Sequence, residues 1–498
     1  MNSTFKPALL LMGGRAAGVA VGFFIPLVLV RLFSQAEFGM YKQVFLVYAT
    51  LYGIAQVGMA ESLFYFLPNA GRRGGRFAAN ALSGLMVAGT VVLAAMVGFG
   101  PMLARWMGSG QLGIPMALMG VYLLLMLTAA VLEISMITGQ RYRLAAGTYS
   151  VSDLARAALY LLPLLISPTL EALLAGAIAF AVLRVIATFV FLSRQFGREL
   201  RPDAGLMRDQ LAYAGPFALA VVLQILQSNL HNYAVSWKFD SASFAIYSVG
   251  CLQIPLIDLV FSSASHVMMV RMGRARSEGR LEEAHAIWTD TTRKLALVFF
   301  PLVCLLLVSA RDLITFLFTP AYAASVPIFM VWSLTILASA FQVDGVLRVF
   351  ARTRFIFVMH GLTLILVLAL IVPMMSTFGM VGAAMVSLIA TFAAKGLGLL
   401  RIRSVMRQPL RTFMPWRSLA TTLALSLIAA VPAWIVAAES VSLPPFIALT
   451  LIAAVYVLAY AVLGLVCGVI TPAERQALLA PLRRLMPVSP QPEESRAP

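Results

Sequence analysis

The chain has 498 residues, of which 61% are hydrophobic and only 11% are charged, and its formal net charge is +17. So few charges cannot cover the apolar surface of a chain this long, which excludes a soluble globular fold. The basic residues form short clusters between hydrophobic stretches, without interleaved aromatic residues, which excludes a nucleic-acid partner. The cysteines lie far apart and the histidines are scattered, so we expect neither a metal site nor a cofactor. The three cysteines are Cys251, Cys304 and Cys467.

Apolar stretches recur along the whole chain, and each is long enough to cross roughly 30 Å of hydrocarbon. They are continuous rather than alternating, which indicates helices and not a closed barrel. The sequence therefore predicts an all-α polytopic membrane protein with about fourteen transmembrane helices. The predicted spans are 8–32, 42–67, 78–103, 113–138, 144–166, 171–195, 209–236, 243–270, 294–318, 324–348, 355–377, 379–400, 415–438 and 444–469.

Every second loop between these spans is basic, and the loops between them carry almost no positive charge. Positive residues collect in cytoplasmic loops, so this alternation predicts that both termini are cytoplasmic. The expected location is the bacterial inner membrane. The arginines that mark the cytoplasmic loops are Arg72, Arg73, Arg76, Arg141, Arg143, Arg194, Arg198, Arg201, Arg208, Arg271, Arg274, Arg276, Arg280, Arg352, Arg354, Arg401, Arg403, Arg407, Arg411 and Arg417.

The longest polar stretch before the C-terminal tail, residues 273–294, predicts a cytoplasmic amphipathic helix at the membrane surface. Residues 471–498 predict a cytoplasmic tail that is partly disordered.

The two halves of the chain resemble each other, which indicates an internal duplication. FSQAEFGMY at 33–41 matches FDSASFAIY at 239–247. Glu133 and the arginines that follow it likewise match Asp344 and the arginines that follow that residue. The offset covers six spans, so the two halves have the same orientation and form a parallel repeat. We therefore expect helices 1–6 in a first lobe (1–200), helices 7–12 in a second lobe (201–405), and helices 13–14 outside the repeat (406–470).

The early RLFSQAEFGMY hairpin at 31–41, in a polytopic chain, resembles the polysaccharide and O-antigen flippases of the multidrug/oligosaccharidyl-lipid/polysaccharide exporter superfamily. This resemblance implies two six-helix lobes arranged as a V, which transport by alternating access. It also implies a lipid-linked substrate, undecaprenyl-diphosphate oligosaccharide. The expected function is translocation of that substrate for O-antigen, capsule or exopolysaccharide synthesis.

Charged residues inside the predicted spans are costly to insert and are therefore candidates for function. Arg15 and Glu61 lie at similar depth in helices 1 and 2, which indicates an ion pair or opposite walls of one cavity. Arg15 is alternatively close enough to the surface to snorkel, but the family resemblance favours the cavity. Gly14, Gly18 and Gly22 lie beside it as an expected packing face.

Arg156 and Arg184 lie near mid-membrane and are further candidates for substrate binding. Arg156 has Asp153 three residues earlier, so a neutralised pair is the alternative. For Arg184 the alternative is a buried pair with Asp153 or Glu133. Asp258 follows Pro255 in helix 8 and is the candidate for coupling to a proton or sodium gradient, or else a hydrogen-bonded acid at a kink.

Glu133 and Asp344 occupy equivalent positions in the repeat, each eight residues before a basic hairpin. We expect each to pair with its own hairpin, Glu133 with Arg141 or Arg143 and Asp344 with the arginines that follow it. No nucleotide-binding loop or catalytic constellation is present in the sequence, so we expect a transporter and not an enzyme.

Two other functions remain compatible with the sequence. The first is a cation-coupled multidrug or organic-cation exporter of the same superfamily, which would need a net acidic cavity where the flippase needs a positive one. The second is an integral-membrane polysaccharide polymerase or ligase, which the short outer loops disfavour. The expected partners are the lipid-linked substrate, the bilayer and other membrane proteins of polysaccharide assembly.

Overall fold

The computed structural model describes residue 18 and residues 21–440 and 443–469, which are almost entirely helical and contain no β-strand. Eight of the described helices are long and apolar enough to cross a membrane, and the number rises to ten if each of two bent pairs is counted as one span. The predicted all-helical membrane fold is confirmed, whereas the count of fourteen spans stays a prediction.

In the first half, the described helices coincide with the predicted spans 1–6. They are Val21–Leu32, α2 (Gln35–Ala55), α3 (Met59–Phe66), α4 (Gly74–Trp106), α5 (Gly113–Ala129), α6 (Val131–Thr138), α7 (Tyr142–Leu161) and α8 (Leu170–Phe196). In the second half they are α9 (Ala204–Lys238), α10 (Ser241–Gly250), α11 (Pro255–Ser277), α12 (Leu281–Val308), α13 (Ala310–Phe318), α14 (Val326–Ser333), α15 (Thr335–Ser339), α16 (Val343–Val349) and α17 (Thr353–Met406). After these come α18 (Leu410–Phe413), α19 (Trp416–Glu439) and α20 (Pro445–Val466).

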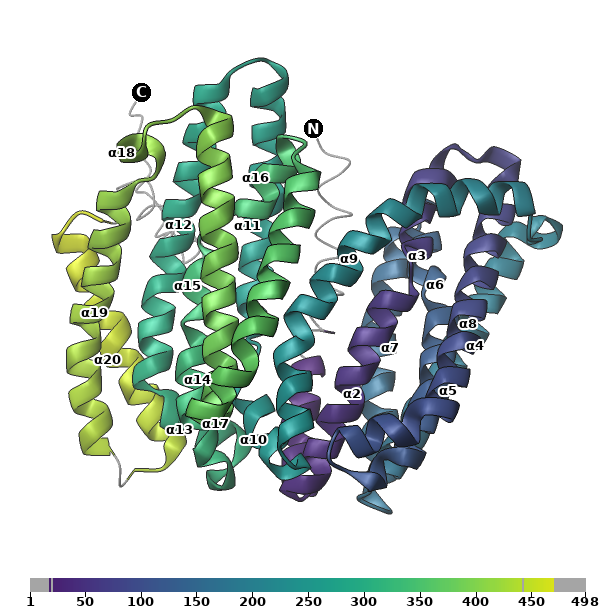
Figure 1. Cartoon of the computed structure of the whole chain (residues 1–498), viewed down its shortest axis with the longest axis horizontal. Coiled ribbons are helices and arrows are strands. Elements are labelled where there is room, and N and C mark those ends of the chain that lie inside the picture. The colour runs from purple at the N-terminus through teal and green to yellow at the C-terminus, as the bar shows by residue number, and fades with distance from the viewer. Residues whose placement is uncertain (1–17, 19–20, 441–442, 470–498) are drawn as a thin grey trace, which may run out of the picture.

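The helices form two groups that diverge toward one end of the molecule and meet at the other, where α2 and α10 lie (Figure 1). The cores follow the same division. At the diverging end one buried cluster contains Leu63 and Leu132 of the first half, and a separate cluster contains Met272 and Leu347 of the second. At the other end a single cluster includes residues of both halves. Each half thus has its own core, and both share a third where they meet. We call this meeting point the vertex.

The hairpin motif at 33–41 specifies the start of α2. Ser34 is the N-cap residue, its hydroxyl accepts from the Glu37 N–H, and the Glu37 carboxylate accepts from the Ser34 N–H in return. This reciprocal capping box satisfies two backbone donors that the helix itself leaves unpaired. At the matching position of the repeat, Asp240 caps α10 and accepts from the Ser243 N–H.

Helix α17 has 54 residues, too many for a single crossing, and it is broken at Gly379, where φ is 59° and ψ is −139°. Only glycine adopts this conformation readily, because a Cβ would clash with the backbone. The chain then doubles back so tightly that a Cβ on Gly382 would lie 2.1 Å from the Met374 carbonyl oxygen. This break falls at the predicted boundary between spans 11 and 12.

The predicted surface helix at 273–294 is wrong. Residues up to Ser277 continue α11 and residues from Leu281 begin α12, so the segment is the tip of a helical hairpin. Ala284, Ile287 and Trp288 are buried in the core of the second half.

Helix α9 connects the two halves and contacts both (Figure 1). At its start, the Asn80 side chain of α4 exchanges two hydrogen bonds with the Asp203 backbone, at 3.0 and 2.7 Å. Hydrogen bonds from the N–H groups of Leu206 and Gly205, with Arg76 beside them, hold the pKa of the Asp203 carboxyl below its usual range. Near its end, Gln227 meets His360 of α17 at 2.7 Å. Helix α9 is therefore hydrogen-bonded to both lobes.

Candidate functional site

Two adjoining cavities lie at the vertex, between α2 on one side and α9, α10 and α11 on the other. Their volumes are about 300 and 400 Å³, and they share four lining residues. The shared residues are Lys42, Ser248, Cys251 and Gln253. Because residues from both halves line them, these cavities change shape whenever the two halves move relative to one another. We refer to the two together as the vertex cavity.

The lining of the vertex cavity combines apolar side chains with several groups that both donate and accept hydrogen bonds. Side chains of Asn229 and Asn232 from α9 face the same space as Gln253, and Trp332 adds an aromatic surface. His231 meets the Tyr247 hydroxyl at 2.6 Å and is buried. Sites that bind small molecules usually combine apolar and aromatic side chains with a few polar groups that orient the ligand.

One cation and one carboxylate line the vertex cavity among the described residues, Lys42 and Asp258. Lys42 is held over the rings of Phe38 and Tyr41, at 5.5 and 5.8 Å from their centroids. Within the described part of the chain it has no carboxylate in ion-pair distance. A lysine with this environment is free to bind an anion that enters the cavity.

Sequence reasoning missed Lys42, although a signal was present. It is the residue directly after the hairpin motif and the first residue of the predicted span 42–67. Asp258 was expected at a kink in helix 8, and that is where it lies. The predicted span 243–270 is bent by 48° between α10 and α11, and Asp258 is in the first turn of α11.

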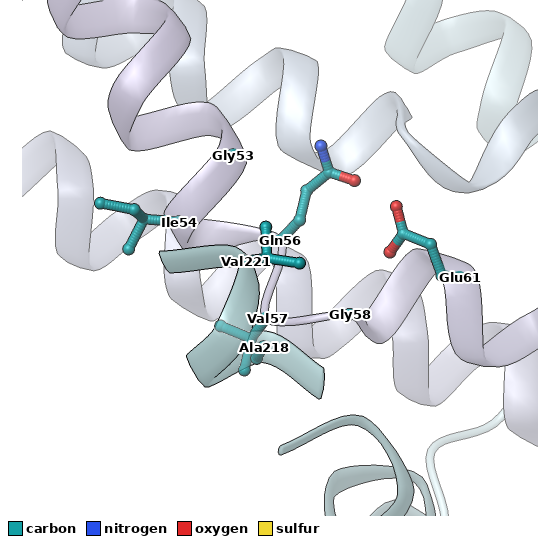
Figure 2. A pocket seen from close by; sticks show the side chains of 8 residues that line it. All are labelled: Gly53, Ile54, Gln56, Val57, Gly58, Glu61, Ala218 and Val221. Atoms are coloured by element: carbon teal, nitrogen blue, oxygen red, sulfur yellow. The ribbon is translucent and has the colours of Figure 1, made fainter. Parts of the chain in front are cut away.

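Glu61 lines a second, smaller pocket between α2, α3 and α9, with a volume of about 140 Å³. The pocket forms at a break in the predicted second span, where Val57 and Gly58 have φ of 46° and 69° and the helix bends by 41°. Figure 2 shows the Glu61 carboxylate and the Gln56 side chain reaching into the same space. Arg15, the predicted partner of Glu61, lies outside the described residues.

Arg184 does not face a cavity as a free cation, because it is bound to Glu133. Its two terminal nitrogens donate to the two Glu133 oxygens at 2.7 and 2.8 Å, and both side chains are almost fully buried. The hydroxyl of Ser152 accepts a third bond at 3.2 Å. This bidentate pair joins α6 to α8, and of the two alternatives for Arg184 the buried pair is the one observed.

Arg156 is also paired. Its guanidinium contacts the Asp153 carboxylate at 2.8 Å on the same helix, which is the neutralised pair that the spacing predicts. This pair lies against the first helix. A Cβ on Gly18 would be 1.7 Å from Asp153 Oδ2, and one on Gly22 would be 3.7 Å from Arg156 Nη2. Gly18 and Gly22 of the expected packing face therefore pack against α7, whereas Gly14 lies outside the described residues.

The pairing predicted for Glu133 and Asp344 with their hairpin arginines is wrong. Glu133 binds Arg184, and the Asp344 carboxylate lies 4.0 Å from Lys395 Nζ on α17. The buried Glu133 has its partner inside the helix bundle and the half-buried Asp344 has one on α17, whereas the hairpin arginines remain exposed. Arg184 and Lys395 are separated by the same 211 residues as Glu133 and Asp344. The two ion pairs are therefore equivalent in the repeat, which favours the predicted duplication.

The end of the vertex farthest from the diverging helices is closed by contacts between the two halves. Arg31 donates to the carbonyl oxygens of Leu317 and Phe316 at 2.9 and 3.0 Å, and Gln35 donates to Ala321 at 2.7 Å. Next to these bonds, Gln43 of α2 donates to Ser236 and accepts from Ser241. All these bonds break if the halves separate at this end.

Solved structures with this arrangement of helices are transporters. "Lipid II flippase MurJ, inward closed conformation" has a TM-score of 0.72 at 13% identity, and the match covers 96% of this chain and 100% of that one. An inward-facing multidrug resistance MATE family transporter of the MOP superfamily has a TM-score of 0.58 at 15% identity, covering 79% and 93%. A MOP superfamily transporter from Pyrococcus furiosus has a TM-score of 0.56 at 13% identity, covering 80% and 95%.

No curated protein sequence matches the chain. A family model described as "polysaccharide biosynthesis protein" matches residues 28–327, which is more than half of its length. This range includes the hairpin motif, Glu133 and most of the residues that line the vertex cavity, among them Lys42 and Asp258. The chain therefore belongs to the polysaccharide biosynthesis protein family, with a fold shared by MurJ and the MATE transporters of the MOP superfamily.

Proposed function

We propose that this protein is a flippase that moves a lipid-linked oligosaccharide, carried on undecaprenyl diphosphate, from the cytoplasmic to the outer face of the inner membrane. The observation that carries the proposal is the vertex cavity, which is lined by amide and hydroxyl side chains, lies between two lobes with separate cores, and contains Lys42 with no carboxylate in ion-pair distance among the described residues. Membership of the family indicates the pathway in which the protein acts, polysaccharide biosynthesis.

The arrangement suits alternating access. With the predicted topology, the closed contacts of Arg31 and Gln35 are on the outer side and the diverging end of the lobes faces the cytoplasm. A substrate head group enters between the lobes, and the amide and hydroxyl groups of the vertex cavity replace water around its sugars. Lys42 offsets part of the cost of bringing a phosphate-bearing group into this low-dielectric space. Rearrangement of the lobes then opens the outer side.

Replacing Lys42 by methionine is expected to lower export at least about ten-fold, because a hydrogen bond to a charged group contributes about 1.5–3 kcal/mol. Protein abundance should stay near normal, since Lys42 is not part of a described ion pair. The measurement is the amount of lipid-linked precursor, by mass spectrometry, in a strain that lacks the chromosomal copy. Lys42→Arg should restore most of the export.

The control is Lys238→Met, which removes an exposed lysine beside Phe239, at the C-terminal end of α9. Precursor should accumulate with Lys42→Met and not with Lys238→Met. Equal export in both variants would contradict a role for Lys42 in binding.

A cation exporter is the second candidate, because carboxylates are also present on this path. Asp258 lines the vertex cavity and Glu61 lines the smaller pocket between α2, α3 and α9. An exporter of organic cations would lose activity when either carboxylate is made neutral, and it would leave the lipid-linked precursor unchanged in a deletion strain.

The orientation gives a separate prediction. We expect periplasm-dependent reporter fusions to be active after residue 108 or 441 and silent after residue 75 or 490, because the basic loops remain in the cytoplasm. An active fusion after residue 490 would contradict the proposed topology, and with it the assignment of the closed contacts to the outer side.

A further inference from the structure

A basic pocket lies outside the vertex cavity, where the middle of α12 meets the start of α19 and the end of α20. Its volume is about 750 Å³. Three arginines from three helices line it, Arg293 of α12, Arg411 of α18 and Arg417 of α19, together with Trp416 and residues 467–469. None of the described residues that line it is acidic. No step of the proposed transport uses this pocket.

The pocket lies at the level where the apolar parts of these helices begin. In α12 every residue from Leu295 to the helix end at Val308 is uncharged, directly after Arg293 and Lys294. Helix α19 begins at Trp416, and α20 ends at Val466. Trp416 is 46% exposed. Tryptophan and arginine at the ends of spanning helices mark the depth of the lipid head groups.

The three arginines of the pocket differ in exposure and in hydrogen bonding. Arg293 is half-buried and its Nη1 donates to the Val469 carbonyl oxygen at 3.4 Å, which fastens the end of α20 to α12. Arg411 and Arg417 are exposed on the rim. The first turn of α19 carries no acidic residue and its N-cap, Pro415, offers no side-chain acceptor, so the helix dipole adds to the positive potential.

We propose that this pocket binds the phosphate head group of an anionic phospholipid from the surrounding leaflet. Guanidinium groups suit phosphate oxygens because they present paired N–H donors. Basic pockets between helices at a membrane surface recognise anionic head groups in this way. The exposed apolar side chains of α19 and α20, among them Leu427, Ile428 and Val457, give the acyl chains a surface.

A lipid bound in this pocket is expected to hold α19 and α20 against α12 of the second lobe. Helices α19 and α20 lie outside the six-helix repeat. The inference needs only the membrane location and would hold even if the transported substrate were a different one.

The test uses the full-length protein in detergent, with lipid binding measured by native mass spectrometry. Phosphatidylglycerol should bind on the order of ten-fold more tightly than phosphatidylcholine, because each basic residue near the surface contributes about 1 kcal/mol. Arg411→Gln with Arg417→Gln should remove this preference, and Arg411→Lys with Arg417→Lys should keep most of it. Arg194→Gln with Arg198→Gln, exposed arginines of the other lobe, is the matched control and should bind like the unmodified protein.

Equal binding of the two phospholipids to the unmodified protein would overturn the proposal, and this comparison stands even if the glutamine pair misfolds. An unchanged preference in a well-folded glutamine pair would also overturn it. Displacement of phosphatidylglycerol by an equal concentration of inorganic pyrophosphate would indicate a small-anion site instead. Displacement by undecaprenyl diphosphate alone would indicate a substrate site.

Discussion

Replacing Gly39 by valine is expected to lower export on the order of a hundred-fold, because the two lobes can no longer meet at the vertex. A Cβ on Gly39 would lie 1.7 Å from the carbonyl oxygen of Ser241 and 2.5 Å from its carbonyl carbon. Both are backbone atoms of α10, so no side chain can move aside. A clash of this kind costs about 1–3 kcal/mol or more, and the closed state loses population accordingly.

The protein itself should still accumulate, since each lobe keeps its own core away from the vertex. Cys251 lines the vertex cavity and reports on its closure. In Gly39→Val, a membrane-impermeant maleimide added from outside should label Cys251, as identified by peptide mass spectrometry, whereas the unmodified protein should resist. Gly98→Val is the matched control, because a Cβ there meets nothing within 4 Å. Normal export in Gly39→Val would contradict the closed contact.

Breaking the Glu133–Arg184 pair is expected to destabilise the protein by about 3–5 kcal/mol, because the remaining charge is left buried without a partner. The side chains are only 7% and 13% exposed, so little solvent screening reduces this cost. Arg184→Met and Glu133→Gln should each lower the melting temperature and the folded yield on size-exclusion chromatography. The double variant should recover much of the loss.

The equivalent pair of the second lobe is a natural control. Asp344 and Lys395 are 4.0 Å apart and the Asp344 side chain is 40% exposed. Asp344→Asn should therefore cost less than Glu133→Gln, because Asp344 is already partly solvated, although it leaves Lys395, which is 17% exposed, without its carboxylate. An equal loss of stability in both lobes would show that the distance and exposure of the pairs do not determine their contribution.

Most of the fold could be predicted from the sequence, because each membrane helix is recognisable from the residues that form it. Their length, the basic loops and the motif at 33–41 are each readable within a few residues, and the break at Gly379 follows from one glycine between two apolar stretches. The pair Arg156–Asp153 was predictable for the same reason, since both residues lie on one helix face.

The rest depends on contacts between helices that are distant in sequence. Glu133 was expected to pair with a hairpin arginine nearby in the chain, but packing of α6 on α8 brings Arg184 to it from 51 residues away. Lys42 is recognisable as a candidate binding residue only in the tertiary structure, where α9 and α10 enclose it together with α2. Likewise, residues 273–294 look amphipathic in isolation, and only the tertiary structure shows that their apolar face is covered by protein.

The most direct test of the proposed function is transport in proteoliposomes. Vesicles are loaded symmetrically with the lipid-linked oligosaccharide that accumulates in the deletion strain, and a membrane-impermeant glycan hydrolase is added outside. With the unmodified protein we expect the hydrolase to consume the lipid-linked sugar of both leaflets, whereas in empty vesicles and with Gly39→Val it should consume only the outer pool. An inner pool that stays protected in the presence of the unmodified, folded protein would contradict the flippase account.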